Sequence, residues 1–342
     1  MKPCGRGDGS VRRIFGWLAF SGLISLLAAL LAGCSSPAPT PAQSSGSRAA
    51  AGGGKKIAII SPAKTSFFHT ELPKGAAEEA QKLGWPSIID QAPAKESDYT
   101  GQVALAQDII QQRPDAISVC GINPEALTNI VAKANQAGIP IFVHNQISPT
   151  KGTVAAYIGY DELAGGKLCG EKMVELLKKK NGAPKGEVAI LDGEPGDHTN
   201  ARAGGFKQAL SAYPDIKVVA EQNGHWLAEP SASTTRDWLQ RFPQLDGVFG
   251  CSDQMAQAAA KVASDAKHPL ITIGIDGNDD TLQDIKSGAA KAVTATLAVQ
   301  PRLMGATIID TMDAYFKGKK PGPVVKTPMV IITKDNVDQY VK

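Results

Sequence analysis

Short polar side chains that could hydrogen-bond a small molecule follow several apolar segments of the chain: Asn123, His144, Asn145, Gln146, Asp192, Ser252, Asp253 and Asp276. Asn and Gln amides offer both a donor and an acceptor, and an ionised Asp accepts from two hydroxyls. Phe67, Phe68 and Trp226 could lie against apolar C–H faces. Together these residues suit a neutral polyhydroxylated ligand, although each polar residue alone is also a common helix cap or turn residue, and Phe67 and Phe68 could simply pack under a loop.

No catalytic or metal motif accompanies them. The sequence lacks a GxSxG elbow, a GxxxxGK[ST] phosphate loop, an HExxH pair and a GxGxxG after a strand. The segment 276–280 resembles a calcium loop, but Thr281 and Ser287 occupy positions that need Gly and Glu. We therefore expect no catalytic residue, no metal and no cofactor. An enzyme remains the alternative, with Asp276, Asp192 and Asp253 as its available carboxylates and no paired histidine in the sequence.

The cysteines indicate neither a disulfide framework nor a zinc site. Cys120, Cys169 and Cys251 are an odd number beyond Cys34, and none has CxxC or Cys/His spacing. We expect them to be small buried hydrophobic residues.

The elements that would position the polar residues alternate regularly. Four consecutive apolar residues, Ile57 to Ile60, predict a strand buried on both faces, followed by a loop over 62–69 and a helix over 72–83. Further strands are expected at 87–90, 116–120, 139–143, 187–191, 216–220, 247–250, 270–275, 292–297 and 328–332. Helices are expected at 103–112, 125–137, 163–177, 201–212, 231–241, 254–266, 281–286 and 302–316.

This alternation predicts α/β architecture with parallel sheets and right-handed crossovers. Because the pattern restarts near the apolar segment 156–161, we expect two similar doubly wound domains. In such sheets the loops after the carboxyl ends of the strands form the ligand crevice, and most of the polar residues above fall in these loops.

Length and composition agree with two soluble domains. The chain has 342 residues, 43% apolar and 20% charged. Its formal charge of +3 resides in residues 1–33, and the remainder holds 32 basic and 32 acidic residues. A neutral body without a basic stripe makes nucleic acid an unlikely partner.

The amino-terminal segment 1–34 has the features of an export signal. Basic residues precede an uncharged run over 14–33, which ends in Leu31, Ala32, Gly33 and Cys34. This tetrapeptide resembles the lipobox of bacterial lipoproteins, which implies lipidation at Cys34 and a place at a membrane surface facing the periplasm or exterior. An uncleaved membrane anchor is the alternative. Arg12 and Arg13 faintly resemble a twin-arginine signal, so the export route stays open. Residues 35–54, rich in Ser, Pro, Ala and Gly, are expected to form a flexible linker.

The loops as a set resemble the periplasmic solute-binding proteins of the ribose-binding type and, more distantly, the ligand domains of LacI-type repressors. The resemblance extends over 56–342 and includes the motifs Thr65-Ser66-Phe67-Phe68, Asn200-Ala201-Arg202 and Ser252-Asp253-Gln254-Met255-Ala256. It implies ligand positions at Thr65, Phe67, Phe68, Asn123, Asn145, Gln146, Asn200, Trp226, Ser252, Asp276 and Gln300, with Arg202 structural. Strict alignment places Val299 rather than Gln300 at the last position.

The resemblance also implies a type I periplasmic-binding-protein-like fold with three hinge segments. The first lobe would comprise 55–157 plus 300–328, and the second 158–299 plus 329–342. Closure of the lobes over a ligand would present a monomer to the membrane subunits of an ABC importer. A chemoreceptor or sensor kinase is an alternative partner, while the export signal excludes a repressor.

Amides replace the two arginines customary at Gln146 and Asn200. A charge-assisted hydrogen bond contributes roughly 1.5–3 kcal/mol against about 1 kcal/mol for a neutral one. We therefore expect a sugar or polyol that differs from ribose.

Overall fold

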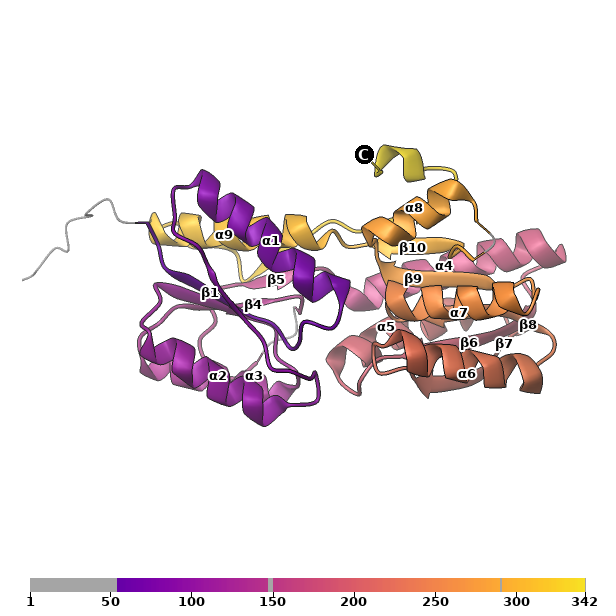
Figure 1. Cartoon of the computed structure of the whole chain (residues 1–342), viewed down its shortest axis with the longest axis horizontal. Helices are drawn as coiled ribbons and strands as arrows, with labels where there is room; N and C mark the ends of the chain where they lie inside the picture. The colour runs from indigo at the N-terminus through magenta and orange to yellow at the C-terminus, as the bar shows by residue number, and fades with distance from the viewer. Residues whose placement is uncertain (1–53, 147–149, 290, 342) are drawn as a thin grey trace, which may run out of the picture. The chain divides into compact units, whose positions relative to one another are not determined.

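The computed structural model describes residues 54–146, 150–289 and 291–341 (Figure 1). The expected signal segment, Cys34 and the linker up to residue 53 lie outside the described residues. Within the described ranges, no helix combines the length and apolar character needed to cross a membrane.

The first sheet contains six parallel strands in the order β2-β1-β3-β4-β5-β11. Their bounds are β1 Ile57–Ile60, β2 Ile89–Gln91, β3 Ala116–Val119, β4 Ile141–His144, β5 Tyr157–Gly159 and β11 Val324–Lys326. Every residue of β1, β3 and β4 is buried, as expected for mainly apolar strands inside a parallel sheet.

The second sheet repeats this order as β7-β6-β8-β9-β10-β12. Its strands are β6 Gly186–Asp192, β7 Ile216–Asn223, β8 Leu245–Gly250, β9 Ile271–Asp276, β10 Ala295–Ala298 and β12 Val330–Thr333. Only β12 runs antiparallel, against β10. Two doubly wound sheets of the same strand order confirm the predicted fold class.

Helices cover both faces of each sheet (Figure 1). In the first domain, α1 (Phe67–Lys82) packs with α9 (Pro301–Phe316), and α2 (Tyr99–Gln111) with α3 (Pro124–Gln136). In the second, α4 (Glu162–Asn181) packs with α5 (Asp197–Leu210), and α6 (Ala228–Arg241) with α7 (Asp253–Asp265). Helix α8 (Asp279–Ser287) contacts a 3₁₀ turn at Val337–Gln339.

Alternate residues of β1 belong to different cores. Ile57 and Ile59 share a core with Leu72 of α1 and Ile308 of α9. Ala58 and Ile60 instead share a core with residues of α2 and α3. The period of two along the strand therefore fixes one helix pair on each face.

Four helices begin three to five residues before their predicted starts, among them α2 at Tyr99 rather than 103 and α6 at Ala228 rather than 231. Helix α1 begins at Phe67 rather than residue 72, because Ser66 adopts an extended conformation and its hydroxyl accepts from the backbone N–H of His69. Phe67 and Phe68 therefore lie in the first helical turn and not in a loop. Helix α5 begins at Asp197 rather than residue 201, which places His198 in its first turn. The short strand β11 was not predicted.

The two domains use the same close helix contact. A Cβ added to Gly75 of α1 would lie 2.1 Å from the carbonyl oxygen of Arg302, and one on Gly305 of α9 would lie 2.0 Å from that of Leu72. In the second domain, a Cβ on Gly166 would lie 2.1 Å from the carbonyl oxygen of Arg202, and a Cβ on Gly205 would lie equally close to that of Leu163. Each pair of helices therefore needs glycine at both crossing points.

The chain passes between the sheets three times: after β5, after β10 and after β11. The expected domain boundary between residues 157 and 158 falls inside β5, which pairs with β4 of the first sheet. Gln300 follows β10 in the left-handed region (φ 51°) and precedes α9.

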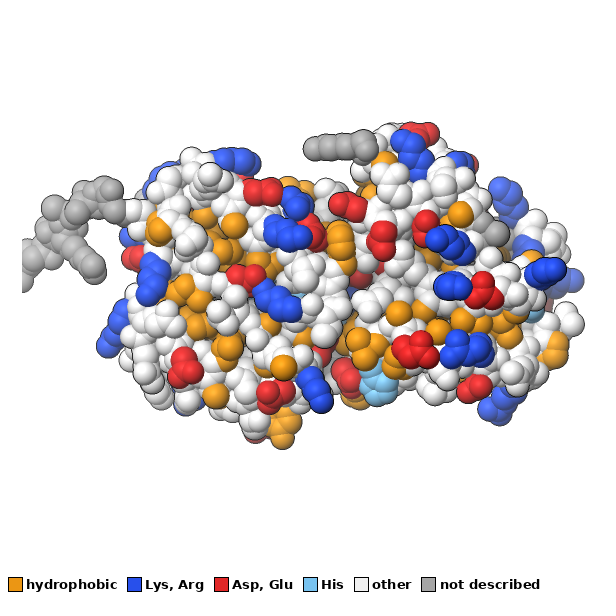
Figure 2. Space-filling model, viewed as in Figure 1, with side chains coloured by type: hydrophobic (Ala, Val, Ile, Leu, Met, Phe, Trp, Pro, Cys, Tyr) orange, Lys and Arg blue, Asp and Glu red, His pale blue; other side chains and the backbone are white. Residues whose placement is uncertain are grey.

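All three cysteines beyond Cys34 are buried, as predicted. On the face drawn in Figure 2, basic and acidic side chains are interspersed, and no uniformly basic area appears. This surface agrees with the neutral body indicated by the sequence.

Candidate ligand-binding site

A cavity lies where residues that follow strands of both sheets meet. The space within it that a water molecule could occupy is about 30 Å³, well below the roughly 300–1,000 Å³ typical of small-molecule sites, so a sugar would fit only with the two walls further apart. Its lining comprises Ser66, Phe68, His69, Glu96 and Asn145 from the first domain, and His198, Arg202, Trp226, Ser252 and Asp276 from the second. The position agrees with the rule that ligands bind outside the carboxyl ends of parallel strands.

Five residues predicted from the sequence line this cavity: Phe68, Asn145, Trp226, Ser252 and Asp276. They come from α1, from the segments after β4, β7 and β8, and from the last residue of β9. All five are at least nine-tenths buried.

The other predicted residues lie elsewhere. The Asn123 carboxamide caps α3 by accepting from the N–H of Ala126 at 2.7 Å, and Gln146 Oε1 accepts from the N–H of Gly121. Phe67 and Gln300 line a separate groove that also contains Arg302. Two further predicted residues, Thr65 and Asn200, are exposed.

Asn145 presents an unsatisfied acceptor to the cavity. It follows β4 with φ 55°, and its N–H donates to the carbonyl oxygen of Ile158 at 2.8 Å. Its side-chain Oδ1 is buried and has no protein partner. Ser252 Oγ is also buried without a partner. Since buried polar atoms are normally hydrogen-bonded, these two atoms favour a ligand that supplies the missing bonds.

Asp276 places a carboxylate at the end of β9. Its backbone has φ 143°, and the residue is only 5% exposed. Burial raises the pKa of Asp276 well above its ordinary value, the nearby Asp253 raises it further, and Arg202 opposes both effects. A ligand hydroxyl would replace the hydration that this carboxylate has lost.

Asp253 holds the loop that carries Asp276. Its Oδ1 accepts from Thr296 Oγ1 at 2.5 Å, and its Oδ2 accepts from the N–H groups of Gly277 and Asn278, each at 2.9 Å. Burial raises the pKa of Asp253 to about 6 despite these bonds. Its carboxylate is therefore used within the protein and fixes the backbone after β9.

Trp226 forms an aromatic wall whose position depends on Gly193. Both His225 and Trp226 have positive φ, 58° and 59°, and a Cβ on Gly193 would lie 1.8 Å from the indole ring. The guanidinium of Arg202 lies 5.4 Å from the ring centroid on one side. The indole ring is thus packed against the backbone at Gly193 and has a cation over its face.

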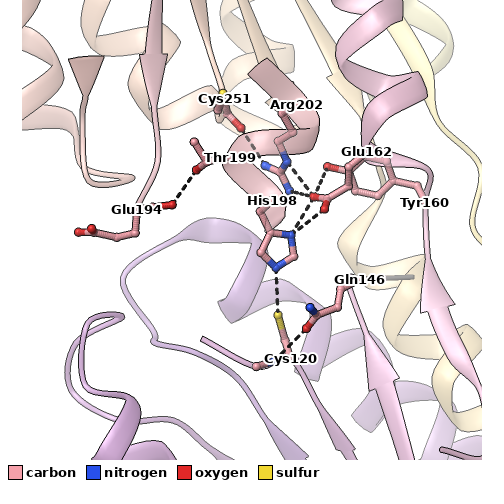
Figure 3. A network of polar contacts seen from close by, with 10 residues as sticks. Cys120, Gln146, Tyr160, Glu162, Glu194, His198, Thr199, Arg202 and Cys251 are labelled. Carbon is pink, nitrogen blue, oxygen red and sulfur yellow. Dashed lines mark hydrogen bonds and ion pairs between the residues drawn. The ribbon is translucent and has the colours of Figure 1, made fainter. Parts of the chain in front are cut away.

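A buried charged cluster supports the second-domain side of the cavity (Figure 3). Glu162 Oε1 accepts from Arg202 Nε at 2.9 Å and forms an ion pair with Arg202 Nη2 at 2.8 Å. The Nδ1–H of His198 donates to the same carboxylate, 2.9 Å from Oε1 and 2.8 Å from Oε2. Tyr160 donates to Oε1 at 3.3 Å, and Arg202 Nη1 donates to the carbonyl oxygen of Cys251 at 2.8 Å.

The cluster sets the charge of its members. Burial would raise the pKa of Glu162, but His198 and Arg202 lower it to about 2. Burial would lower the pKa of His198, but Glu162 raises it well above its ordinary value. His198 is therefore an imidazolium and Glu162 a carboxylate at neutral pH.

Sequence reasoning missed five lining residues: Ser66, His69, Glu96, His198 and Arg202. Arg202 was assigned a structural role, which its ion pair fits, but its side chain also lines the cavity. Burial raises the pKa of Glu96 to about 7. The ion pair between His198 and Glu162 could not be predicted from the sequence, because the two residues are 36 positions apart.

Within the described ranges, no group of three or more His, Cys, Asp or Glu side chains is placed to hold a metal ion. The Sγ of Cys120 lies 3.8 Å from His198 Nε2, so thiol, imidazole and carboxylate stand in line. Cys120 has no exposed surface and does not line the cavity, so a substrate could not reach its sulfur.

Two doubly wound domains joined by three chain crossings, with a polar and aromatic cavity at the carboxyl ends of their strands, define a two-lobed solute-binding protein. The chain belongs to the periplasmic binding protein family, whose model, described as a periplasmic binding protein domain, matches residues 57–320.

Curated relatives are similar over most of the chain. The ribose import binding protein of Bacillus subtilis is 30% identical over 320 residues, covering 92% of this chain and 99% of the relative. A xylitol-binding protein of Mycolicibacterium smegmatis is 32% identical over 247 residues, covering 71% of this chain and 68% of the relative.

A solved ABC transporter solute-binding protein from Burkholderia graminis, in complex with D-arabinose, has a similar structure. Its TM-score is 0.76 at 29% identity, and the match covers 85% of this chain and 99% of the other. The family predicted from the loop motifs is thus confirmed.

Proposed function

We propose that this protein captures a sugar or polyol in the cavity between its two domains and delivers it to the membrane subunits of an ABC importer. The observation that carries the proposal is the pairing, in one buried cavity, of apolar rings with polar groups that lack protein partners. Phe68 and Trp226 supply the rings, and Asn145 Oδ1 and Ser252 Oγ supply the polar groups, while the Asp276 carboxylate lines the same cavity. The names of the ribose, xylitol and D-arabinose relatives support this ligand class.

Binding rather than turnover fits the chemistry of the site. The Asp253 carboxylate accepts hydrogen bonds from the loop after β9, and Cys120 is inaccessible. The ion pair with Glu162 keeps His198 protonated, and an imidazolium cannot serve as a general base. The relatives described above are binding proteins by name.

The ligand need not be ribose. Of the two positions where the family commonly has arginine, Gln146 is bonded to Gly121 and Asn200 is exposed. A cation in the cavity is instead Arg202, whose Nε and Nη1 donate to Glu162 and to the carbonyl oxygen of Cys251 and whose Nη2 forms an ion pair with Glu162. Recognition of hydroxyls by Asn145, Ser252 and Asp276 is common to many sugars and polyols.

The proposal is tested by a thermal-shift screen of the purified protein with ribose, D-arabinose, D-allose, xylitol, myo-inositol, nucleosides and amino acids. A ligand at 1,000 times its dissociation constant stabilises the folded state by roughly 4 kcal/mol, which is a shift of several degrees. Stabilisation by a sugar or polyol is the expected result. Stabilisation only by amino acids or nucleosides would refute the carbohydrate assignment.

We also propose that lipidation at Cys34 anchors the protein at the outer face of a membrane, with residues 35–54 as the linker to the folded domains. The support is the Leu31 to Cys34 tetrapeptide that closes the apolar run. The Cys34→Ser variant should lose incorporation of a radiolabelled fatty acid. Equal labelling of variant and parent would contradict the anchor.

A further inference from the structure

The turn that carries Trp226 into the cavity has a strained backbone. His225 and Trp226 are consecutive residues with positive φ, 58° and 59°, a left-handed conformation that is unfavourable for residues other than glycine. Two bulky residues in succession keep it only where the surrounding structure holds them. Because Trp226 lines the cavity and is only 8% exposed, the strain lies at the candidate site itself.

Glu194 joins this turn to the segment after β6. The Nδ1–H of His225 donates to Glu194 Oε1 at 2.8 Å, and Asn223 Nδ2 donates to Glu194 Oε2 at 3.4 Å. Asn223 Oδ1 in turn accepts from the backbone N–H of His225 at 2.6 Å. Glu194 is itself fixed to α5, because its carbonyl oxygen accepts from Thr199 Oγ1 at 2.7 Å (Figure 3). The carboxylate therefore holds the strained His225 against a segment that is anchored elsewhere in the domain.

The exposure of this pair favours a role in orientation over a role in folding. The side chains of His225 and Glu194 are 49% and 33% exposed, and exposed ion pairs contribute little to folding stability. The indole of Trp226 packs against Gly193, which leaves no room there for a Cβ. Because Gly193 directly precedes Glu194, one segment supplies both the surface against which the indole packs and the carboxylate that holds the turn.

We propose that Glu194 is a positioning residue for ligand binding, which acts through His225 and Asn223 to hold the strained turn that keeps the Trp226 indole in the cavity. This inference rests on the proposed function and adds to it how the aromatic wall is oriented. An indole that is held in place before binding need not be ordered by the ligand. A relaxed turn would lower the affinity in proportion to the molecules in which the indole is misplaced.

The charge of Glu194 also reaches the cavity, and two variants separate it from the hydrogen bond. Burial raises the pKa of Glu96 in the first domain, and the charge of Glu194 raises it further. Glu194→Gln removes the charge but keeps an oxygen that can accept from the Nδ1–H of His225, whereas Glu194→Ala removes both. A positioning role therefore predicts a loss in the alanine variant and not in the glutamine variant.

The test measures calorimetric affinity for the sugar or polyol that gives the largest thermal shift in the screen. Glu194→Ala should weaken binding by about 5- to 20-fold, while the melting temperature of the free protein stays within about 2 °C of the parent. Glu194→Gln should bind within about threefold of the parent. Parent affinity in Glu194→Ala would overturn the inference, as would equal losses in the two variants.

Two further variants test whether the effect passes through the indole. Glu221→Ala is the matched control, because the Glu221 side chain is 34% exposed and pairs with Lys207, neither of which lines the cavity. It should leave the affinity unchanged, and a loss equal to that of Glu194→Ala would overturn the inference. In the Trp226→Ala background, Glu194→Ala should cause no further loss. An additive loss there would show that Glu194 acts on the ligand by another route.

A second measurement needs no ligand and separates this inference from the proposed function. In protein labelled with fluorotryptophan, the ¹⁹F resonance of Trp226, assigned with Trp226→Phe, should be a single narrow line in the parent. In Glu194→Ala it should shift, broaden or split, while the resonances of Trp85 and Trp238 stay in place. An unchanged Trp226 resonance would overturn the inference even if sugars bind. Absence of binding by the parent to every sugar and polyol would instead refute the proposed function.

Discussion

Asn145 and Asn200 carry the same side chain, and the sequence predicts a ligand contact for both. The structure places them differently. The Asn145 carboxamide lines the cavity with an unpartnered Oδ1, whereas Asn200 is exposed on α5. We therefore expect Asn145, and not Asn200, to contact the ligand.

Asn145→Ala should lower the affinity for the ligand found in the screen by about 5- to 30-fold, because one hydrogen bond is lost and its partner on the ligand stays buried without one. Asn200→Ala is the matched change and should alter affinity by less than about twofold. Calorimetric titration of both variants decides between them. A larger effect at Asn200 would show that the resemblance to the family, and not the cavity, identifies the ligand contacts.

His144 makes folding sensitive to acid. The side chain is fully buried, its Nδ1 is hydrogen-bonded to Ser118 Oγ at 2.8 Å, and its Nε2 has no partner. Burial, aided by the charge of His198, lowers the pKa of His144 to about 3. The unfolded chain therefore binds this proton first, and stability falls as the pH decreases from about 6.5 towards 3.

His144→Gln removes this titration and retains a hydrogen-bond partner for Ser118. Between pH 7 and pH 5 the parent should lose about 2 kcal/mol more unfolding free energy than the variant, since each pH unit below the unfolded pKa contributes about 1.4 kcal/mol. Urea unfolding at the two pH values measures the difference. Identical pH dependence in parent and variant would show that His144 is not held neutral.

Site residues could be predicted from the sequence where a local pattern surrounds them. Asp276 and Asn145 could be identified because they directly follow buried strands, and Phe68 because an aromatic there is unusual in a polar stretch. Asn123 has the same local pattern, but its side chain caps α3. The ion pair of Glu162 with His198 joins the starts of α4 and α5, and no local pattern encodes it.

At the scale of elements, the crossing of α4 and α5 depends on glycine at the contact. A Cβ on Gly205 would lie 2.1 Å from the carbonyl oxygen of Leu163, while one on the adjacent Gly204 would have Leu163 Cδ1 at 3.9 Å as its nearest neighbour. The same helix pair carries Glu162, His198 and Arg202, so its spacing also sets the wall of the cavity.

Gly205→Ala should lower the free energy of unfolding by about 1–3 kcal/mol, because the backbones must separate. Gly204→Ala should be neutral or stabilise by up to about 1 kcal/mol through helix propensity. Thermal and urea unfolding of the two variants provide the comparison. Equal destabilisation would indicate that the close approach of α4 and α5 does not limit stability.

Element types were predictable because strands buried on both faces give continuous apolar runs, and amphipathic helices separate them. Helix starts were less predictable. Ser66 could be recognised as a cap only if the adjacent Phe67 and Phe68 were accepted as helical. The edge strand β11 is only three residues long and has two exposed residues, so its sequence lacks a buried pattern.

At the scale of the whole molecule, the residues that line the cavity come from both domains, and the chain joins these domains by three crossings. A ligand that contacts both walls stabilises the arrangement in which the walls are close. Small-angle scattering should therefore show a smaller radius of gyration with saturating ligand than without it. An unchanged radius at full occupancy would contradict closure, and a sugar that gives no thermal shift serves as the control.

The most direct test of the account is a crystal structure of the protein with the sugar or polyol identified in the screen. We predict one ligand molecule between the domains, with hydroxyls within hydrogen-bond distance of Asn145 Oδ1 and the Asp276 carboxylate and its apolar face against Trp226 or Phe68. A ligand bound elsewhere, or one that leaves both Asn145 and Asp276 without a contact, would contradict the assignment of this cavity as the binding site.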